Sequence, residues 1–368
     1  MKKYNDAKRI LCIVNSMNMG GAETFLMKLY RALDKSKYQM DFCVTEDGIY
    51  DNEIKDMGGK IYTVPQKSKR PLKSFFSIKK IVKNYKYENV LRTSSQSLAT
   101  LDLLAAKFGG AKKIIYRSSN AGMTGKGISK LINNIFSFLP KIIPNVKIAP
   151  STEAAEFVFG KKALKNGKVT IIPNGLDYNF FKFDNEKRNK TRENLKLSDK
   201  HIIGHVGRFN KQKNHNFLID IFYELRKKDQ KAHLLLIGKG ELEKEINEKL
   251  NNLRLSDCVT IMPPVSNINE YYMAMDILVF PSFFEGMPNV VIEAQASDLP
   301  CILSDAITKE ANITGKLIYK SINNSAESWA NEIIKKYDNY ERKDNIDYFK
   351  KSGYIIDDNI SIYTKIMF

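Results

Sequence analysis

The sequence predicts an α/β protein built from two doubly wound domains. Strand-like and helix-like runs alternate along the whole chain of 368 residues, a rhythm typical of parallel sheets covered by helices. At roughly 150 residues per domain this length suits two domains, and an apolar content of 43% can fill two cores. A polar, charged stretch at residues 184–200 separates the two series of runs.

The first series is expected to form an amino-terminal domain at residues 1–172. Short aliphatic and aromatic runs predict buried strands, and amphipathic stretches between them predict helices. A lysine-rich stretch that begins at Pro71 is one of these helices. The expected strands are residues 9–15, 38–45, 60–64, 89–92, 113–117, 147–150 and 169–173, and the other expected helices are residues 22–33 and 98–108.

The second series is expected to form a carboxyl-terminal domain at residues 173–350, entered through a structural turn at residues 172–177. Ligands of doubly wound sheets bind beyond the carboxyl ends of the strands, so the two domains are expected to face each other across a ligand-binding cleft. The expected strands are residues 201–207, 233–237, 259–262, 276–280 and 300–303, and the expected helices are residues 214–228, 241–253, 268–274, 288–296 and 326–337.

Composition excludes several classes of protein. An aromatic content of 11% excludes a disordered chain. The chain has no apolar run of about 18 residues and no secretory signal, so we expect it neither to span a membrane nor to be secreted. No pair of cysteines has metal or redox spacing, which predicts buried, reduced thiols in a cytosol at Cys12, Cys43, Cys258 and Cys301.

The positive charge is concentrated in the first half of the chain. Residues 1–172 hold 31 Lys and Arg against 13 Asp and Glu, whereas residues 173–368 hold 28 of each. Such an asymmetry favours a negatively charged partner, either nucleic acid or an anionic membrane surface. The chain has neither a zinc-finger spacing nor an RNP-like aromatic motif, so no nucleic-acid partner is expected.

Residues 67–83 favour the membrane because lysines and apolar residues alternate there in the manner of a helix lying on an anionic bilayer. The alternative is a surface helix whose apolar stripe packs on its own domain. The apolar residues expected near one face are Leu72, Phe75, Phe76, Val82 and Tyr85.

Two glycine- or cation-containing loops follow predicted strands. Gly20 and Gly21 precede a helix, where adjacent glycines allow a ligand close to the backbone amides at a positive helix end. A plain strand-to-helix turn is the alternative. Arg208 and Lys213 follow another strand and could converge on an anion, with a solvated basic loop as the alternative.

The most specific segment is residues 281–294, which holds Glu285 in a loop and Glu293 in the following helix. Pro288 at the first helical turn leaves the amides of Asn289 and Val290 available to a phosphate. Glu293 lies among apolar residues, where a solvated role is unfavourable, and it can accept hydrogen bonds from two hydroxyls of a ribose.

With these motifs the chain resembles, nearly end to end, the retaining nucleotide-sugar glycosyltransferases of family 4, which have the GT-B fold. The resemblance is carried by a Gly-Gly-x-Glu loop at residues 20–23, Ile-Pro-Asn-Gly at 172–175, Gly-Arg with a Lys five residues on, and the Glu-x7-Glu pair in a Phe-Glu-Gly-x-Pro context. The closing segment, residues 351–368, is similar to the family's last segment, which crosses back to the amino-terminal domain.

The resemblance implies a role for each matching residue. Arg208 and Lys213 would hold the donor diphosphate, Glu293 the ribose, and Glu285 the hydroxyls of the transferred sugar. Val265 falls where the family contacts the nucleobase, although Pro263 replaces a usual glycine. The remaining donor-binding residues would be Gly20, Gly21, Gly286, Met287, Pro288, Asn289 and Val290.

The chain departs from the family's pattern at one position that would contact the transferred sugar or the acceptor. Ser119 stands where the family often has a His, so Ser119 and Asn120 are candidate contacts whose effect on sugar preference or catalysis the sequence leaves open. No Asp-x-Asp metal motif is present, so no metal or other cofactor is expected. Positive side chains and helix amides would instead stabilise the charge on the leaving nucleoside diphosphate.

We therefore expect a cytoplasmic, retaining, metal-independent glycosyltransferase, peripheral on the inner face of the plasma membrane. It would move a sugar from a nucleotide donor, UDP favoured over GDP, to a lipid-linked or glycan acceptor in capsule, exopolysaccharide or O-antigen synthesis. A non-catalytic nucleotide-sugar-binding subunit and a GT-B sugar-nucleotide epimerase are the alternatives. The sugar, the acceptor, the linkage and the oligomeric state stay open.

Overall fold

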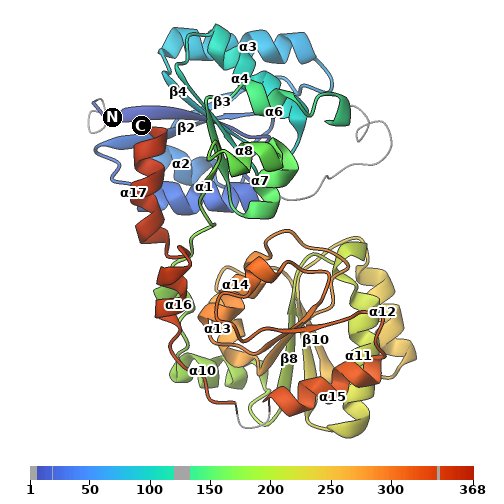
Figure 1. Cartoon of the computed structure of the whole chain (residues 1–368). Helices are drawn as coiled ribbons and strands as arrows, with labels where there is room; N and C mark the ends of the chain where they lie inside the picture. Colours follow the sequence, from blue (N-terminus) through green and yellow to red (C-terminus); the bar gives the residue numbers. More distant parts are fainter. Residues whose placement is uncertain (1–5, 19, 120–132, 338–339) are drawn as a thin grey trace. The chain divides into compact units, whose positions relative to one another are not determined.

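The computed structural model describes residues 6–18, 20–119, 133–337 and 340–368 (Figure 1). The chain divides into two compact units. Unit 1 consists of Met1–Leu176 together with Gly353–Phe368, and unit 2 of Asp177–Ser352. Both the boundary expected at residue 172 and this division at Leu176 fall in the Ile-Pro-Asn-Gly-Leu-Asp turn.

Unit 1 contains a seven-stranded parallel sheet in the order β3-β2-β1-β4-β5-β6-β7. Its strands are β1 (Lys8–Ile13), β2 (Tyr38–Val44), β3 (Ile61–Thr63), β4 (Asn89–Thr93), β5 (Lys113–Arg117), β6 (Val146–Ala149) and β7 (Thr170–Ile171). Its helices are α1 (Gly21–Ala32), α2 (Asp51–Asp56), α3 (Pro71–Tyr85), α4 (Thr100–Phe108), α6 (Leu139–Ile142), α7 (Thr152–Phe159), α8 (Lys161–Lys165) and α17 (Ile356–Met367).

Apolar side chains cover both faces of this sheet. Alternate residues of β1 point to opposite faces, so Ile10 and Cys12 join one core cluster while Leu11 and Ile13 join the other. Strands buried on both faces read as continuous apolar runs, which is why β1 was recognisable in the sequence.

Unit 2 contains a six-stranded parallel sheet in the order β10-β9-β8-β11-β12-β13. Its strands are β8 (His201–Val206), β9 (Ala232–Ile237), β10 (Val259–Met262), β11 (Ile277–Phe280), β12 (Cys301–Ser304) and β13 (Ile318–Lys320). Its helices are α9 (Tyr178–Phe181), α10 (Asn185–Leu195), α11 (His215–Lys228), α12 (Glu243–Asn252), α13 (Ile268–Ala274), α14 (Asn289–Ala296), α15 (Ala326–Tyr337) and α16 (Ile346–Lys351).

The strand orders confirm two doubly wound α/β domains. In unit 1 the direction of winding reverses between β1 and β4, and in unit 2 it reverses between β8 and β11. Ligands of such sheets bind at these switch points, beyond the carboxyl ends of the strands. The loops after β1, β8 and β11 are therefore the positions to examine for a site.

The polar stretch at residues 184–200 is not a mere separator, because it contains α10 of unit 2. Asp184 caps this helix by accepting from the amides of Glu186 and Lys187. Arg188 and Arg192 bind the largely buried carboxylate of Asp276. Burial works to raise the pKa of Asp276, but the two guanidinium groups outweigh it and lower that pKa. The charges are thus satisfied by tertiary ion pairs.

The carboxyl-terminal segment belongs to unit 1. Leu176 and Ile355 form a parallel bridge, in which the amide of Leu176 donates to Tyr354 O at 2.9 Å and that of Ile356 donates to Leu176 O at 3.1 Å. Further along, Tyr363 of α17 is buried and accepts a hydrogen bond from Nε of the buried Arg117 at 3.2 Å.

Two smaller expectations can be compared with the structure. The four cysteines are free thiols, of which Cys12, Cys43 and Cys301 are buried, but Cys258 is only half-buried. Among the described residues, no helix combines the length and the apolar character that crossing a bilayer requires.

Candidate active site

The loop after β8 is bound to the loop after β11 at the switch point of unit 2. Asn210 caps the short 3-10 helix η2 (Lys211–Lys213) by accepting from the amide of Lys213. Asn214 has a left-handed backbone (φ 56°), and its buried side-chain amide donates to Pro281 O at 3.1 Å. Gln212 and residues Phe283 and Phe284 exchange two further hydrogen bonds of 2.9 Å. These contacts hold the two loops in register.

Lys213 and Glu285, which are 72 residues apart in the sequence, form an ion pair at this junction. The Nζ to Oε1 distance is 2.7 Å, and the side chains are only 14% and 10% exposed. The Lys213 ammonium also lies 4.4 Å from the centre of the Phe280 ring, a distance typical of a cation–π contact. The structure therefore places a fixed, mostly desolvated cation beside a carboxylate.

Arg208 begins the same loop but has a different partner. Its guanidinium is 71% exposed and lies 3.3 Å from the carboxylate of Glu241, which is 56% exposed. A surface pair of this kind contributes little to stability, so the Arg208 side chain can exchange Glu241 for another anion at low cost. Arg208 and Lys213 therefore pair with different carboxylates, those of Glu241 and Glu285.

Sequence reasoning missed the loop after β9, residues 238–241. A Cβ atom on Gly238 would lie 1.9 Å from Gly207 O, so only glycine allows this loop to pack on the backbone beside Arg208. The amide of Phe209 donates to Lys239 O at 3.0 Å, which joins the two loops. The signal was present in the sequence as Gly-Lys-Gly-Glu directly after a buried strand.

Helix α14 follows the β11 loop and starts at Asn289, with Pro288 at the N-cap position. The helix starts one residue later than expected, and Gly286, Met287 and Val290 are half-buried around its amino end. The first amides of a helix have no acceptor within it, so this end is suited to an anion. Pro288 itself is buried.

Glu293 lies in the second turn of α14 and is half-buried. Its Oε2 accepts a hydrogen bond of 3.1 Å from the phenol of Tyr272. Burial, together with the nearby Glu293 carboxylate, raises the pKa of Tyr272 well above its ordinary value, so the phenol stays protonated and donates.

Val265 is half-buried in the loop after β10, and β9 separates that strand from β8.

Two buried histidines lie behind the Lys213 loop and were not singled out in the sequence. His205 of β8 stacks on Phe280 with ring centres 5.2 Å apart, and it contacts His215 at 4.8 Å. Burial and the neighbouring Lys213 charge lower the pKa of His215 to about 4, so its ring is neutral at pH 7. These rings support Phe280 rather than supply charge.

In unit 1, Gly20 and Gly21 lie at the amino end of α1, beyond the carboxyl end of β1. A Cβ atom on Gly20 would meet Glu23 Oε2 at 2.3 Å, whereas, apart from its chain neighbours and the backbone of α1, no atom of the described residues lies within 4 Å of a Cβ on Gly21. The space beside Gly21 is thus open. Ser119 follows β5 and is half-buried, and Asn120 lies outside the described residues.

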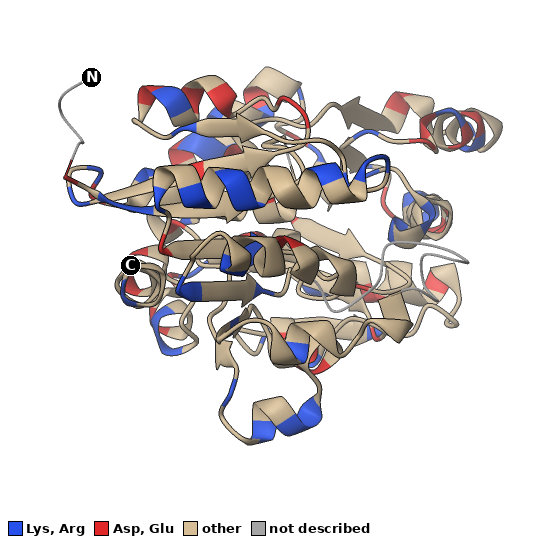
Figure 2. Cartoon of the chain, turned by 90° about the horizontal axis from the view of Figure 1, so that it is seen from above, with Lys and Arg blue, Asp and Glu red and all other residues tan. Residues whose placement is uncertain are grey.

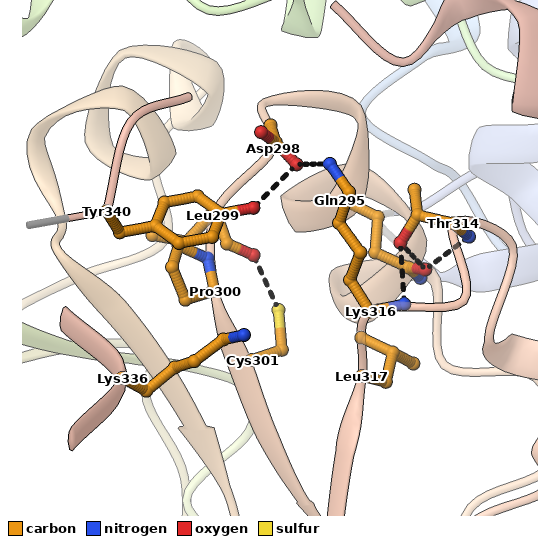
Figure 3. A pocket seen from close by; sticks show the side chains of 10 residues that line it. All are labelled: Gln295, Asp298, Leu299, Pro300, Cys301, Thr314, Lys316, Leu317, Lys336 and Tyr340. Atoms are coloured by element: carbon orange, nitrogen blue, oxygen red, sulfur yellow. Dashed lines mark hydrogen bonds and ion pairs between the residues drawn. The ribbon is translucent and has the colours of Figure 1, made fainter. Parts of the chain in front are cut away.

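One further cavity of unit 2 is too small to hold a substrate. A cavity at the other end of α14, shown in Figure 3, has a volume of only about 10 Å³, enough for about one water molecule. Its Asp298 carboxylate is already hydrogen-bonded to Lys316 and Tyr340.

In the part of the chain that the structure describes, no group of three or more His, Cys, Asp or Glu side chains is arranged to hold a metal.

Comparisons with known proteins agree with the two-domain division. Residues 19–180 match the family model described as "Glycosyltransferase Family 4", and residues 200–339 match the one described as "Glycosyl transferases group 1". The putative glycosyltransferase EpsF of Bacillus subtilis is 32% identical over 337 residues, which cover 89% of this chain and 87% of that relative.

A more distant relative and a solved structure extend the comparison. The UDP-Gal:alpha-D-GlcNAc-diphosphoundecaprenol alpha-1,3-galactosyltransferase of Escherichia coli is 22% identical and covers 78% of this chain and 76% of its own. The crystal structure of Anabaena Alr3699/HepE in complex with UDP-glucose is similar with a TM-score of 0.71, at 18% identity and 98% and 95% coverage of the two chains. This structural likeness shows that the two chains share a fold.

Proposed function

This chain belongs to glycosyltransferase family 4 and has the GT-B fold, and on that premise we propose that it transfers a sugar from a nucleotide-sugar donor to a lipid-linked or glycan acceptor in polysaccharide synthesis. UDP is the favoured nucleotide, and the anomeric configuration of the sugar is retained. The observation that carries this proposal is the buried Lys213–Glu285 pair at the switch point of unit 2, beside the amino end of α14.

We assign the donor contacts by the chemistry of each group. The Lys213 ammonium, the exposed Arg208 guanidinium and the backbone amides of Met287, Asn289 and Val290 bind the diphosphate, because all are hydrogen-bond donors at one edge of the sheet. Glu293 accepts from the ribose hydroxyls, and Glu285 accepts from the transferred sugar. The nucleobase contacts Val265, and the backbone of Gly286 also contacts the donor. Gly20 and Gly21 lie beside the diphosphate.

The proposed catalysis is electrostatic. As the bond between the sugar and the phosphate breaks, negative charge grows on the leaving nucleoside diphosphate. A cation already fixed by Glu285 and Phe280 stabilises that charge without reorganising, and the gain is larger in the transition state than in the ground state. The acceptor hydroxyl attacks from the face that the phosphate leaves, and the phosphate takes its proton. These protein groups fill the role of a metal, so no cofactor is proposed.

Two comparisons support UDP and a lipid-linked acceptor. The solved structure of Alr3699/HepE contains UDP-glucose. The name of the relative from Escherichia coli gives UDP-Gal as its donor and a diphosphoundecaprenol-linked sugar as its acceptor. Ser119 and Asn120 are kept as proposed contacts to the sugar or the acceptor.

Helix α3 supports a membrane partner, although not by the apolar face first expected. Val82 is fully buried in the core of unit 1, Phe75 is half-buried, and Tyr85 lies near Tyr62. Leu72 and Phe76, in contrast, are 74% and 59% exposed on the outer side of the helix. Figure 2, which looks down on α3, colours Lys and Arg residues blue, and several blue positions lie along this helix.

An exposed helix face that combines lysines with Leu72 and Phe76 is suited to an anionic bilayer surface. We therefore propose that the protein works in the cytoplasm, bound peripherally to the inner face of the plasma membrane. Such a position would bring unit 1 to an acceptor embedded in that membrane.

Release of nucleoside diphosphate from UDP- and GDP-sugars, with and without a lipid-linked acceptor, tests the proposed reaction. We expect Lys213→Ala and Arg208→Ala to abolish most of the turnover, whereas Lys211→Ala, an exposed lysine of the same loop, leaves it unchanged. Full turnover in Lys213→Ala would end the proposal. Binding without any hydrolysis or transfer would indicate a non-catalytic subunit, and a new sugar epimer in NMR spectra would indicate an epimerase.

A further inference from the structure

A second hollow lies in unit 1, at the amino ends of β1 and β4, the opposite edge of the sheet from the Gly20 loop. Its volume is about 450 Å³, which is in the range of small-molecule sites. The start of β1 and the end of α17 lie close together in Figure 1, and Lys8 of β1 and Phe368, which follows α17, both line the hollow. The side chains that line it include Lys8, Arg9, Lys60, Tyr85, Lys86 and Tyr87.

Arg9 is fixed in the wall of this hollow. Its Nε and Nη2 donate to the fully buried carboxylate of Asp41 at 2.7 and 2.5 Å, and Nη2 also donates to Gly58 O at 3.0 Å. Burial alone would lower the pKa of Arg9, but the hydrogen bonds and charge of Asp41 raise it. Among the described residues Nη1 has no hydrogen-bond acceptor, so two N–H donors of a rigid guanidinium remain for a ligand.

Three lysines add positive charge that the protein does not neutralise. Lys8, Lys60 and Lys86 are exposed at the rim, and none of them has a carboxylate within 4 Å in the described part of the chain. Glu88 also lines the hollow, but it is paired with Lys112 at 2.6 Å. The ammonium groups of Lys8, Lys60 and Lys86 therefore give the hollow a positively charged rim.

Lys86 occupies its place at the rim at a conformational cost. It ends α3 in the left-handed region, with φ 55°, where glycine is the usual residue. Tyr85, its neighbour, keeps 55% of its surface exposed, and Lys60 Nζ lies 5.9 Å from the centre of its ring. An exposed aromatic face beside cations is suited to the ring of a sugar or another flat group.

We infer that this hollow binds a phosphate-bearing ligand. A phosphate group carries up to two negative charges and three acceptor oxygens, which match the Nη1 edge of Arg9 and the unpaired ammonium groups of Lys60 and Lys86. The volume leaves room for an attached sugar or glycerol moiety against Tyr85. The phosphate can come from an anionic lipid headgroup, since α3 ends at this hollow, or from a soluble phosphate compound. This inference does not depend on the proposed function, because all of its residues belong to unit 1 and none belongs to the β8 and β11 loops of unit 2.

Calorimetric titration with inorganic pyrophosphate tests the inference, with saturating UDP present to occupy a donor site. The test variants are Lys86→Gly and Lys60→Gln. Glycine suits the backbone of residue 86, so Lys86→Gly removes the charge without unfolding the helix end. Lys196→Gly is the matched control, because Lys196 also ends a helix in the left-handed region, at φ 58° in unit 2.

We expect pyrophosphate affinity to fall about tenfold in Lys86→Gly and further in the double variant, and to stay unchanged in Lys196→Gly. No pyrophosphate binding, or equal binding by the parent and the double variant, would overturn the inference. If neither UDP nor GDP binds while pyrophosphate binding still depends on Lys86, the proposed function fails and the inference stands.

Vesicles of phosphatidylglycerol diluted in phosphatidylcholine distinguish the two sources of phosphate. If the ligand is a lipid headgroup, pyrophosphate displaces the protein from these vesicles and Lys86→Gly weakens sedimentation. If the ligand is soluble, glucose 1-phosphate competes with pyrophosphate for the hollow, and vesicle binding is the same in Lys86→Gly and the parent. Either result supports a phosphate site at the amino edge of the sheet.

Discussion

Replacing Lys213 by methionine separates the catalytic charge of this residue from its packing. Methionine keeps an unbranched side chain against Phe280 but removes the ammonium that lies 2.7 Å from Glu285. Loss of one preorganised donor to a developing oxyanion costs about 3 kcal/mol. We therefore expect kcat to fall about 100-fold, because about 1.4 kcal/mol corresponds to each factor of ten.

The same substitution leaves Glu285 as a buried carboxylate without its ammonium partner. Breaking a buried ion pair by removing one partner costs about 3–5 kcal/mol of folding stability. The side chains of Lys213 and Glu285 remain 14% and 10% exposed, so we expect a cost toward the lower end of that range. Adding Glu285→Gln removes the stranded charge. The double variant should therefore recover most of the unfolding temperature that Lys213→Met loses, yet be at least as slow as Lys213→Met, because Glu285 also contacts the transferred sugar in the proposed site.

The assay is release of nucleoside diphosphate from the preferred donor, measured beside thermal unfolding of each variant. Lys211→Met is the control, because Lys211 is exposed in the same short helix. If Lys213→Met is folded at the assay temperature and its kcat stays within about threefold of the parent, the electrostatic reasoning is refuted. If the double variant regains full activity, the role of Lys213 is only to neutralise Glu285.

Three further predictions concern other parts of the chain. Burial lowers the pKa of His215 to about 4 from an ordinary value near 6.5, so below pH 6.5 only the unfolded chain takes up this proton. Stability should fall by up to about 3 kcal/mol as the pH drops toward 4, and denaturant titrations of His215→Leu should show a flatter dependence. Gly21→Ala should keep the unfolding temperature, because the added Cβ would meet no atom of the described residues beyond its chain neighbours and the backbone of its own helix. It should lower kcat/KM for the donor, and an unchanged kcat/KM would remove Gly21 from the site. Replacing Leu72 and Phe76 by serine should weaken sedimentation with anionic vesicles at least tenfold, since each exposed side chain contributes about 1.5–3 kcal/mol when buried in lipid, whereas Ile49→Ser, a control with 59% exposure, should not.

Much of the fold was predictable because its signals are local. The continuous apolar run of β1 and the Gly-Gly-x-Glu and Phe-Glu-Gly-x-Pro segments each identify a strand or a loop by composition alone. Helix α10 was missed because its charged residues resemble a linker until Arg188 and Arg192 are seen to share Asp276. The strand β13 was missed because three half-buried residues carry too little pattern.

The sequence by itself determined the two doubly wound domains, the chemistry available at their loops and the concentration of positive charge in residues 1–172. Only the tertiary structure decided that Lys213 pairs with Glu285 while Arg208 pairs with Glu241, and that Leu72 and Phe76 point to solvent while Val82 packs in the core. The physical reason is the range of each interaction. Periodicity, turn chemistry and charge are properties of neighbouring residues, whereas an ion pair across 72 residues depends on which strands become neighbours in the sheet.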